Sequence, residues 1–213
     1  MIAGARLRWA RPGPDARSRR GAERGYSLLE LIFVAVIGVT ASAVAIPQYL
    51  AGLDDFRTSG AARYVSGRFQ RARMEAVMRS ASVAIQFTET ARGYEYAVYM
   101  DGNRNGVLTR DIESGADRRI GAVERLRDLF TGVDFGAIPG LPPVDPGGPS
   151  PGTDPIRLGA SSLASFSAVG TASTGTVYLR GREDSQYAVR IFGETGKTRL
   201  LKFNRHTRRW RQI

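Results

Sequence analysis

One uninterrupted apolar run dominates the pattern of hydrophobic and polar positions along the chain. It covers residues 26–46, which is 21 residues, and carries a single charge, Glu30. As a helix it would be about 31 Å long, close to the thickness of a bilayer core of about 30 Å. No further charged residue occurs before Asp54. The pattern therefore predicts one membrane-spanning helix over residues 26–46.

Beyond this run the periodicity changes twice. Apolar positions first recur every three or four residues, which predicts a helix that continues to about residue 81. From residue 82 they alternate, as in strands with one buried face. The expected strands are 82–88, 94–100, 175–180, 186–192 and 198–203, with 207–213 as an edge strand. Residues 137–155 are dense in Pro and Gly and are expected to form a long surface loop. These elements predict an α+β fold, in which one long N-terminal helix packs on an antiparallel β-sheet.

The distribution of charge refines this picture. The chain has 213 residues and a formal net charge of +11. Residues 1–25 carry a net +5 and residues 197–213 a net +7, so the body between them is almost neutral. A basic flank in front of an apolar segment predicts a cytoplasmic N-terminus. Residues 47–213 would then lie on the other side of the membrane.

Three interpretations of the apolar segment differ in how they treat Glu30. A secretory signal peptide could be cut after Ala43 or Ala45, but its apolar stretch is normally shorter. A plain membrane anchor explains the length and the basic flank but not the acid. A carboxylate inside a membrane segment costs roughly 2.5–3.5 kcal/mol, so such a residue usually has a partner and a function.

The residues around Glu30 suggest the third interpretation. Residues 25–30 (GYSLLE) resemble the processing motif of type IV prepilins, a glycine followed by an aromatic residue and then a glutamate. The resemblance implies that residues 1–25 are a cytoplasmic leader. Prepilin peptidase would cut between Gly25 and Tyr26 and N-methylate Tyr26. Glu30 would then pair with the new α-amine of a neighbouring subunit, because an unpaired charge in a dry helix bundle costs several kcal/mol.

Later stretches narrow the resemblance to the GspH/FimT family of pseudopilins and minor pilins. These stretches are 72–76, 101–106, 166–170 and 175–179, and Pro47 stands where the family often has a helix-bending proline. The resemblance implies a single-pass inner-membrane protein with a periplasmic domain over residues 47–213. It also implies prepilin peptidase, other pilin-like subunits and the assembly platform of a secretion system or pilus as partners. The expected function is that of a subunit of a type II secretion pseudopilus.

Few residues suggest catalysis or metal binding. The chain has no cysteine and one histidine, His206, which excludes thiol chemistry and leaves no support for a hydrolytic triad. Residues 101–112 superficially match a calcium loop, but Ile112 takes the place of the bidentate glutamate. We interpret residues 101–106 as a hairpin turn, since Asn and Gly tolerate positive φ. We expect no enzyme activity, no cofactor and no metal.

The basic C-terminal tail leaves alternatives open. Its seven bases alternate with Phe203, His206 and Trp210, a combination suited to binding nucleic acid without sequence preference. The bases are Lys197, Arg199, Lys202, Arg205, Arg208, Arg209 and Arg211. Residues 196–199 (GKTR) resemble a Gly-Arg-x-Arg pattern in the FimT branch, which implies DNA binding by a type IV pilus minor pilin during natural transformation. A solvated final strand, or contact with an acidic partner or an anionic surface, would explain the same charges.

Overall fold

A computed structural model describes residues 25–159 and 161–213. The expected leader, apart from Gly25, lies outside these residues. The chain divides between Ala43 and Val44 into two compact units. In the first, residues 25–27 are not helical and the long helix α1 (Leu28–Arg79) begins directly after them. Every described residue of this unit is exposed. We call residues 44–213 the globular unit and describe it separately.

The buried face of α1 follows the predicted helical spacing and is confined to the globular unit. Its buried residues are Asp54, Thr58, Ala61, Ala62, Val65, Ser66, Phe69, Ala72 and Ala76. The helix ends near the expected position because Ser80 adopts a left-handed conformation with φ of 51°. The amide of Ala81 then donates to the carbonyl of Ala76 at 3.2 Å, which satisfies a terminal carbonyl.

The strands form two antiparallel sheets. The first has the order β3-β2-β1-β7 with β4 paired to β2, and the second has the order β11-β10-β9-β8-β5 with β6 paired to β8. The first sheet contains β1 (Val83–Thr90), β2 (Gly93–Met100), β3 (Arg118–Arg119), β4 (Glu124–Arg125) and β7 (Leu163–Phe166). The second contains β5 (Asp134–Phe135), β6 (Ile156–Arg157), β8 (Gly175–Arg180), β9 (Gln186–Ile191), β10 (Thr198–Asn204) and β11 (Arg209–Gln212). Two short helices, α2 (Thr109–Ser114) and α3 (Leu126–Leu129), complete the unit.

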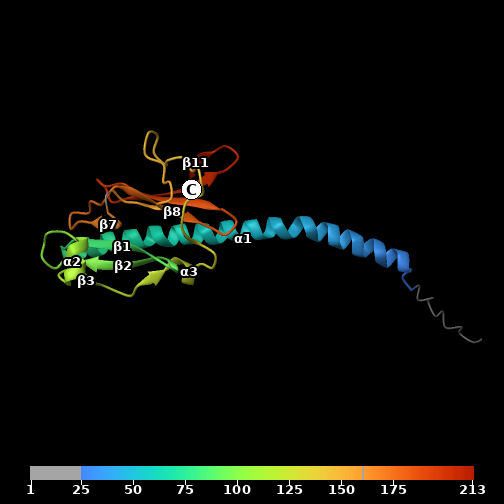
Figure 1. Ribbon diagram of the computed structural model, residues 1–213, viewed down its shortest axis with the longest axis horizontal. Coiled ribbons are helices and arrows are strands. Elements are labelled where there is room, and N and C mark those ends of the chain that lie inside the picture. Colours follow the sequence, from blue (N-terminus) through green and yellow to red (C-terminus); the bar gives the residue numbers. More distant parts are fainter. Residues whose placement is uncertain (1–24, 160) are drawn as a thin grey trace, which may run out of the picture. The chain divides into compact units, whose positions relative to one another are not determined.

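The two sheets share one hydrophobic core with α1. Figure 1 shows β1 and β2 on one side of the helix and β8 on the other. Phe69 of α1 is fully buried and lies 6.3 Å from the ring of Phe87 in β1, between ring centroids. The core continues into the second sheet through residues such as Val189 of β9. The α+β prediction is therefore confirmed, with two sheets around the helix rather than one.

A second, smaller core lies on the outer face of the second sheet, and the Pro/Gly stretch covers it. Ile138 and Leu141 of this stretch are buried against Tyr178 and Phe203. The indole Nε1 of Trp210 donates to the carbonyl of Pro142 at 3.0 Å. Residues 137–155 are therefore more than a surface loop, because they supply one layer of this core.

Burial of tyrosines predicts a loss of stability at alkaline pH. Burial, assisted by Glu89, raises the pKa of Tyr94 to about 12. Burial also raises the pKa of Tyr64 and Tyr96, whose hydroxyls donate to Glu124 at 2.7 and 3.0 Å. The unfolded chain ionises these phenols from the ordinary pKa of 10.0, so it binds fewer protons than the folded chain above that pH. The free energy of unfolding should be constant to about pH 10 and then fall as the pH rises towards 12.

Tyrosinate absorbance and circular dichroism, recorded during the same alkaline titration, would test this expectation. Tyr94→Phe should reduce the pH dependence because it removes one of the raised phenols. Ionisation of all eight tyrosines near pH 10, without loss of structure, would contradict it.

Candidate functional site

The N-terminal motif lies in an open segment directly before α1. Gly25 and Tyr26 are exposed and not helical, and nothing lies within 4 Å of the place where a Cβ on Gly25 would be. The hydroxyl of Ser27 accepts a hydrogen bond from the amide of Glu30 at 3.2 Å. Ser27 is thus the N-cap of α1 and Glu30 is the third helical residue, the arrangement of a capping box. Sequence analysis missed this N-cap, although the Ser-x-x-Glu spacing indicates it.

The other hydroxyl groups in the apolar run are satisfied within the helix. Thr40 donates to the carbonyl of Val36 at 2.9 Å, and Ser42 donates to that of Gly38 at 2.7 Å. Such bonds suit a helix in lipid, where an unsatisfied polar group is costly. The carboxylate of Glu30, by contrast, has no hydrogen-bond or ion-pair partner within residues 25–159 and 161–213. Glu30 is the charged residue of the apolar run, and its carboxylate requires a partner from elsewhere.

Pro47 lies inside α1, in the globular unit. Its nitrogen cannot donate to the carbonyl of Ala43, so one helical hydrogen bond is missing there. The helix is nevertheless continuous from Leu28 to Arg79, and its apolar N-terminal part is long enough to cross a membrane.

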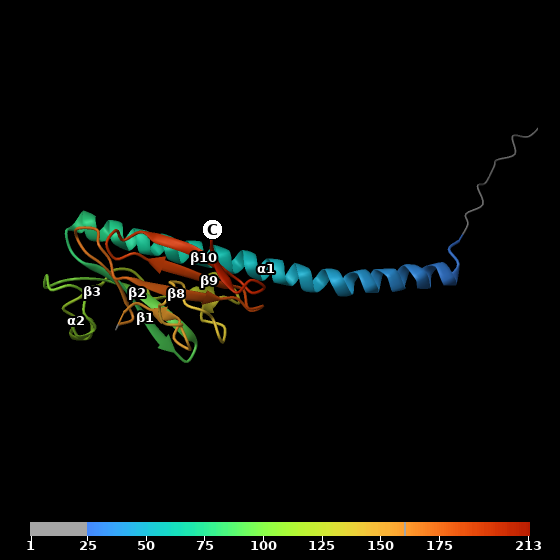
Figure 2. The same ribbon diagram turned by 90° about the horizontal axis from the view of Figure 1, so that it is seen from above.

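The seven bases of the tail do not form one patch. Figures 1 and 2 show α1 running along the strands of the second sheet. At one end of β10, Thr198 contacts Ser66 of α1 at 2.7 Å between hydroxyl oxygens. At the other end, Lys202 lies 2.7 Å from a carboxylate oxygen of Asp55. These two contacts are about 16 Å apart along the helix, so Lys197 and Arg199 are separated from Arg205 and Arg208.

Three of the seven bases have partners within the globular unit. Partial burial opposes the charged form of Lys202, but Asp55 and Tyr187 outweigh this effect and raise its pKa. Arg205 pairs with Asp184 at 2.9 Å, and Arg208 donates to the carbonyl of Gly140 at 3.0 Å. In the described part of the chain, Lys197, Arg199, Arg209 and Arg211 form no ion pair.

The aromatic residues of the tail do not lie where the DNA interpretation requires them. Phe203 is buried, and its ring lies 5.3 Å from that of Trp210 between centroids, under residues 137–155. These rings cannot stack on bases without removal of the loop. Phe203 and Trp210 therefore lie on the covered outer face of the sheet, whereas His206, between β10 and β11, is exposed.

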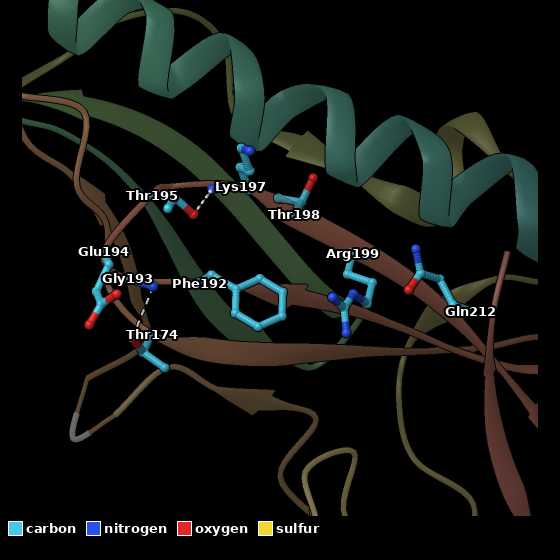
Figure 3. A pocket seen from close by; sticks show the side chains of 9 residues that line it. All are labelled: Thr174, Phe192, Gly193, Glu194, Thr195, Lys197, Thr198, Arg199 and Gln212. Carbon is cyan, nitrogen blue, oxygen red and sulfur yellow. Dashed lines mark hydrogen bonds between the residues drawn. The ribbon is translucent and has the colours of Figure 1, made fainter.

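Two bases of the tail, Lys197 and Arg199, line a groove of about 570 Å³ on the second sheet. It is lined by Thr174, Phe192, Gly193, Glu194, Thr195, Lys197, Thr198, Arg199 and Gln212. Figure 3 shows Arg199 pointing into the groove and Lys197 pointing towards α1. The guanidinium carbon of Arg199 lies 5.0 Å from the ring centroid of Phe192. Sequence analysis did not identify Phe192, which directly follows β9, two residues after Arg190.

The calcium-like segment is closed by its own hydrogen bonds. Asp101 accepts from the amides of Asn103, Arg104 and Gly106 at 2.7–3.0 Å. Residues 101–106 begin the long connection between β2 and β3, which includes α2. The hairpin turn expected at these residues is therefore not formed. Within residues 25–159 and 161–213, no group of three or more His, Cys, Asp or Glu side chains could hold a metal ion.

Comparisons with family models, with curated proteins and with solved structures gave no match to this chain. The architecture itself, a long apolar N-terminal helix followed by antiparallel sheets, is consistent with a pilin-like protein.

Proposed function

We propose that this protein is a pilin-like subunit of the GspH/FimT kind that is assembled into a type II secretion pseudopilus. The observation that carries the proposal is the carboxylate of Glu30, a charge near the start of a membrane-length helix that has no partner in the part of the chain the structure describes. In a bundle of such helices, the α-amine that cleavage creates at Tyr26 of a neighbouring subunit would neutralise it. This ion pair would set the register between neighbouring helices, because the carboxylate and the α-amine meet at only one axial offset of the two subunits.

The geometry before α1 supports processing at the expected bond. A peptidase needs an extended and accessible substrate, and residues 25–27 are exposed and not helical. Cleavage there would leave Ser27 as the second residue of the mature chain, so the N-cap and the helix start would survive. The mature protein would retain one membrane span, with the globular unit in the periplasm.

Mass spectrometry of the mature chain from a strain that expresses the full sequence tests this proposal directly. We expect a methylated N-terminus at Tyr26 in nearly all of the protein. Gly25→Val should accumulate the uncut precursor, because a branched side chain would enter the cleavage position. Gly38→Val is the matched control, since nothing lies within 4 Å of a Cβ at Gly38 either and it lies away from the cleaved bond.

Other N-termini would decide against the proposal. A mature chain that begins after Ala43 or Ala45 would indicate a signal peptide. An uncut chain in the membrane would indicate a plain anchor.

The alternative function, a type IV pilus minor pilin that binds DNA, is supported by one observation. Arg199 and Phe192 line an exposed groove, and Lys197 lies at its rim. A base and an aromatic ring together can contact a phosphate and a nucleobase. Phe203 is buried and Trp210 is packed under residues 137–155, so neither ring is free to stack on bases, and we rank this alternative second.

A further inference from the structure

The outer face of the second sheet is only partly covered. Residues 137–155 cover Tyr178, Ala188, Leu201 and Phe203. Farther along the same face, Arg190 and Phe192 follow Ala188 at intervals of two residues, and Arg199 precedes Leu201 in the same way. The groove of about 570 Å³ includes Phe192 and Arg199 and lies in the uncovered part (Figure 3).

Two arginines oppose each other across this face. Arg190 of β9 and Arg199 of β10 are directly paired in the sheet register. Their guanidinium carbons lie 5.7 and 5.0 Å from the ring centroid of Phe192. Like charges at directly opposed positions destabilise a sheet unless an acid compensates them. This pair therefore requires carboxylates.

The chain supplies one of these carboxylates itself. Asp145, within the Pro/Gly stretch, lies 2.5 Å from a guanidinium nitrogen of Arg190. Pro143 and Val144, which precede it, line the same hollow as Arg190. A proline-rich acidic segment thus already docks on half of the arginine pair. In the described part of the chain, Arg199 has no corresponding acid.

We infer that the groove binds an extended acidic segment of a partner protein, with a carboxylate on Arg199 and an apolar side chain against Phe192. The carboxylate of the partner would pair with Arg199 in the way that Asp145 of the chain itself pairs with Arg190. The surface does not suit a second copy of the same sheet, because a second Arg199 would only add like charge. This inference does not depend on filament assembly or on processing at Gly25.

The chemistry of the groove favours a carboxylate over a nucleic-acid backbone. Binding to nucleic acid draws its strength from several phosphate contacts at once. Here one arginine points into the groove, Glu194 lies at its other end (Figure 3), and Lys197 points away. The hydroxyls of Thr174 and Thr195 each accept one backbone amide of the chain and can still donate to a carbonyl of a bound peptide. A bound segment with one carboxylate between apolar and polar side chains fits this groove better than a series of phosphates does.

Fluorescence anisotropy with the full chain in detergent micelles tests the inference. The probe is a short peptide, GVDPELDG, that carries a neutral fluorophore, and its uncharged counterpart is GVNPQLNG. We expect the acidic peptide to bind at low salt and the uncharged one to bind at least about fivefold more weakly. Arg199→Gln should weaken binding of the acidic peptide about three- to tenfold. Arg209→Gln removes the same charge from β11 outside the groove and should change the affinity less than about twofold.

A second variant separates binding from loss of structure. Asp145→Asn should free Arg190 and increase the affinity for the acidic peptide about threefold, a gain that misfolding cannot produce. Equal binding of the two peptides, or an equal loss for Arg199→Gln and Arg209→Gln, would overturn the inference. So would a single-stranded oligothymidine that binds the groove more tightly than the peptide at the same salt concentration, because that result would assign the groove to nucleic acid.

Discussion

Replacing Glu30 with glutamine is expected to leave cleavage at Gly25 intact and to reduce incorporation of the protein into filaments at least about tenfold. The membrane-length helix satisfies its hydroxyl groups internally, but the Glu30 carboxylate has no partner in the described residues. If it pairs with a neighbouring α-amine during assembly, the variant leaves that amine buried without a counter-charge. Breaking a buried pair in this way costs roughly 3–5 kcal/mol, which is more than the 1.4 kcal/mol of a tenfold effect.

Glutamine separates the charge of Glu30 from the size and polarity of its side chain. The backbone amide of residue 30 donates to Ser27, and this bond survives any substitution that keeps the helix. Glu30→Gln therefore removes only the charge, whereas Glu30→Ala also removes the rest of the polar side chain. The readout is the fraction of processed protein in sheared filaments, measured by immunoblot against the membrane fraction. Wild-type incorporation of the glutamine variant would refute the pairing.

The elements with strong periodicity were predictable from sequence, and their bounds show why. Strand β8 coincides with the predicted 175–180, and β9 and β10 differ from their predictions by one residue each. Each has at least six residues, enough to show alternation. The helix ended at Arg79 instead of about 81, because Ser80 closes it in a left-handed conformation. Local patterns of this length are decided by burial of one face.

The short strands and the second core could not be predicted for the opposite reason. Strands β3, β4, β5 and β6 have two residues each, which is too short for any period to appear. Ile138 and Leu141 stand among prolines and glycines, and only the folded chain places them against Tyr178. Pro and Gly indicate an irregular backbone, but they do not indicate whether that backbone is exposed.

Of the two candidate sites, one could be predicted from the sequence and the other could not. Glu30 could be identified from the sequence because a carboxylate is unusual inside an apolar segment. The groove could not, since Phe192 follows β9 and Arg199 belongs to β10, and the two meet through the register of these strands. The tail was interpreted as one basic surface. Sequence order does not reveal that the two ends of β10 contact α1 at positions about 16 Å apart.

Asp54 provides the largest expected effect on folding. It is 6% exposed, and its two carboxylate oxygens accept from the amides of Arg182 and Ser185 at 2.8 and 3.3 Å. These amides belong to the turn between β8 and β9, so Asp54 joins α1 to the second sheet. Gly181 allows this close approach, because a Cβ there would lie 2.4 Å from oxygens of both Asp54 and Thr58.

Asp54→Ala is therefore expected to lower the free energy of unfolding by about 2–4 kcal/mol. Each hydrogen bond to a charged acceptor contributes about 1.5–3 kcal/mol, and the variant leaves two amides of the turn without their acceptor. Asp54→Asn should cost less, because it keeps one acceptor oxygen. Asp128→Ala is the control: it removes an exposed acid, whose 4.0 Å pair with Arg125 should contribute no more than about 1 kcal/mol.

Urea unfolding of the full chain in micelles, followed by the fluorescence of Trp210, would measure these differences. Trp210 reports on the second sheet, because its ring packs on Tyr178 and Phe203. A loss for Asp54→Ala no larger than that for Asp128→Ala would show that the turn finds other acceptors. Cleavage after Gly25 should be unchanged in both variants, since the processing motif lies outside the globular unit. A variant that loses stability but is still processed would therefore separate the folding of the sheets from the chemistry of the N-terminus.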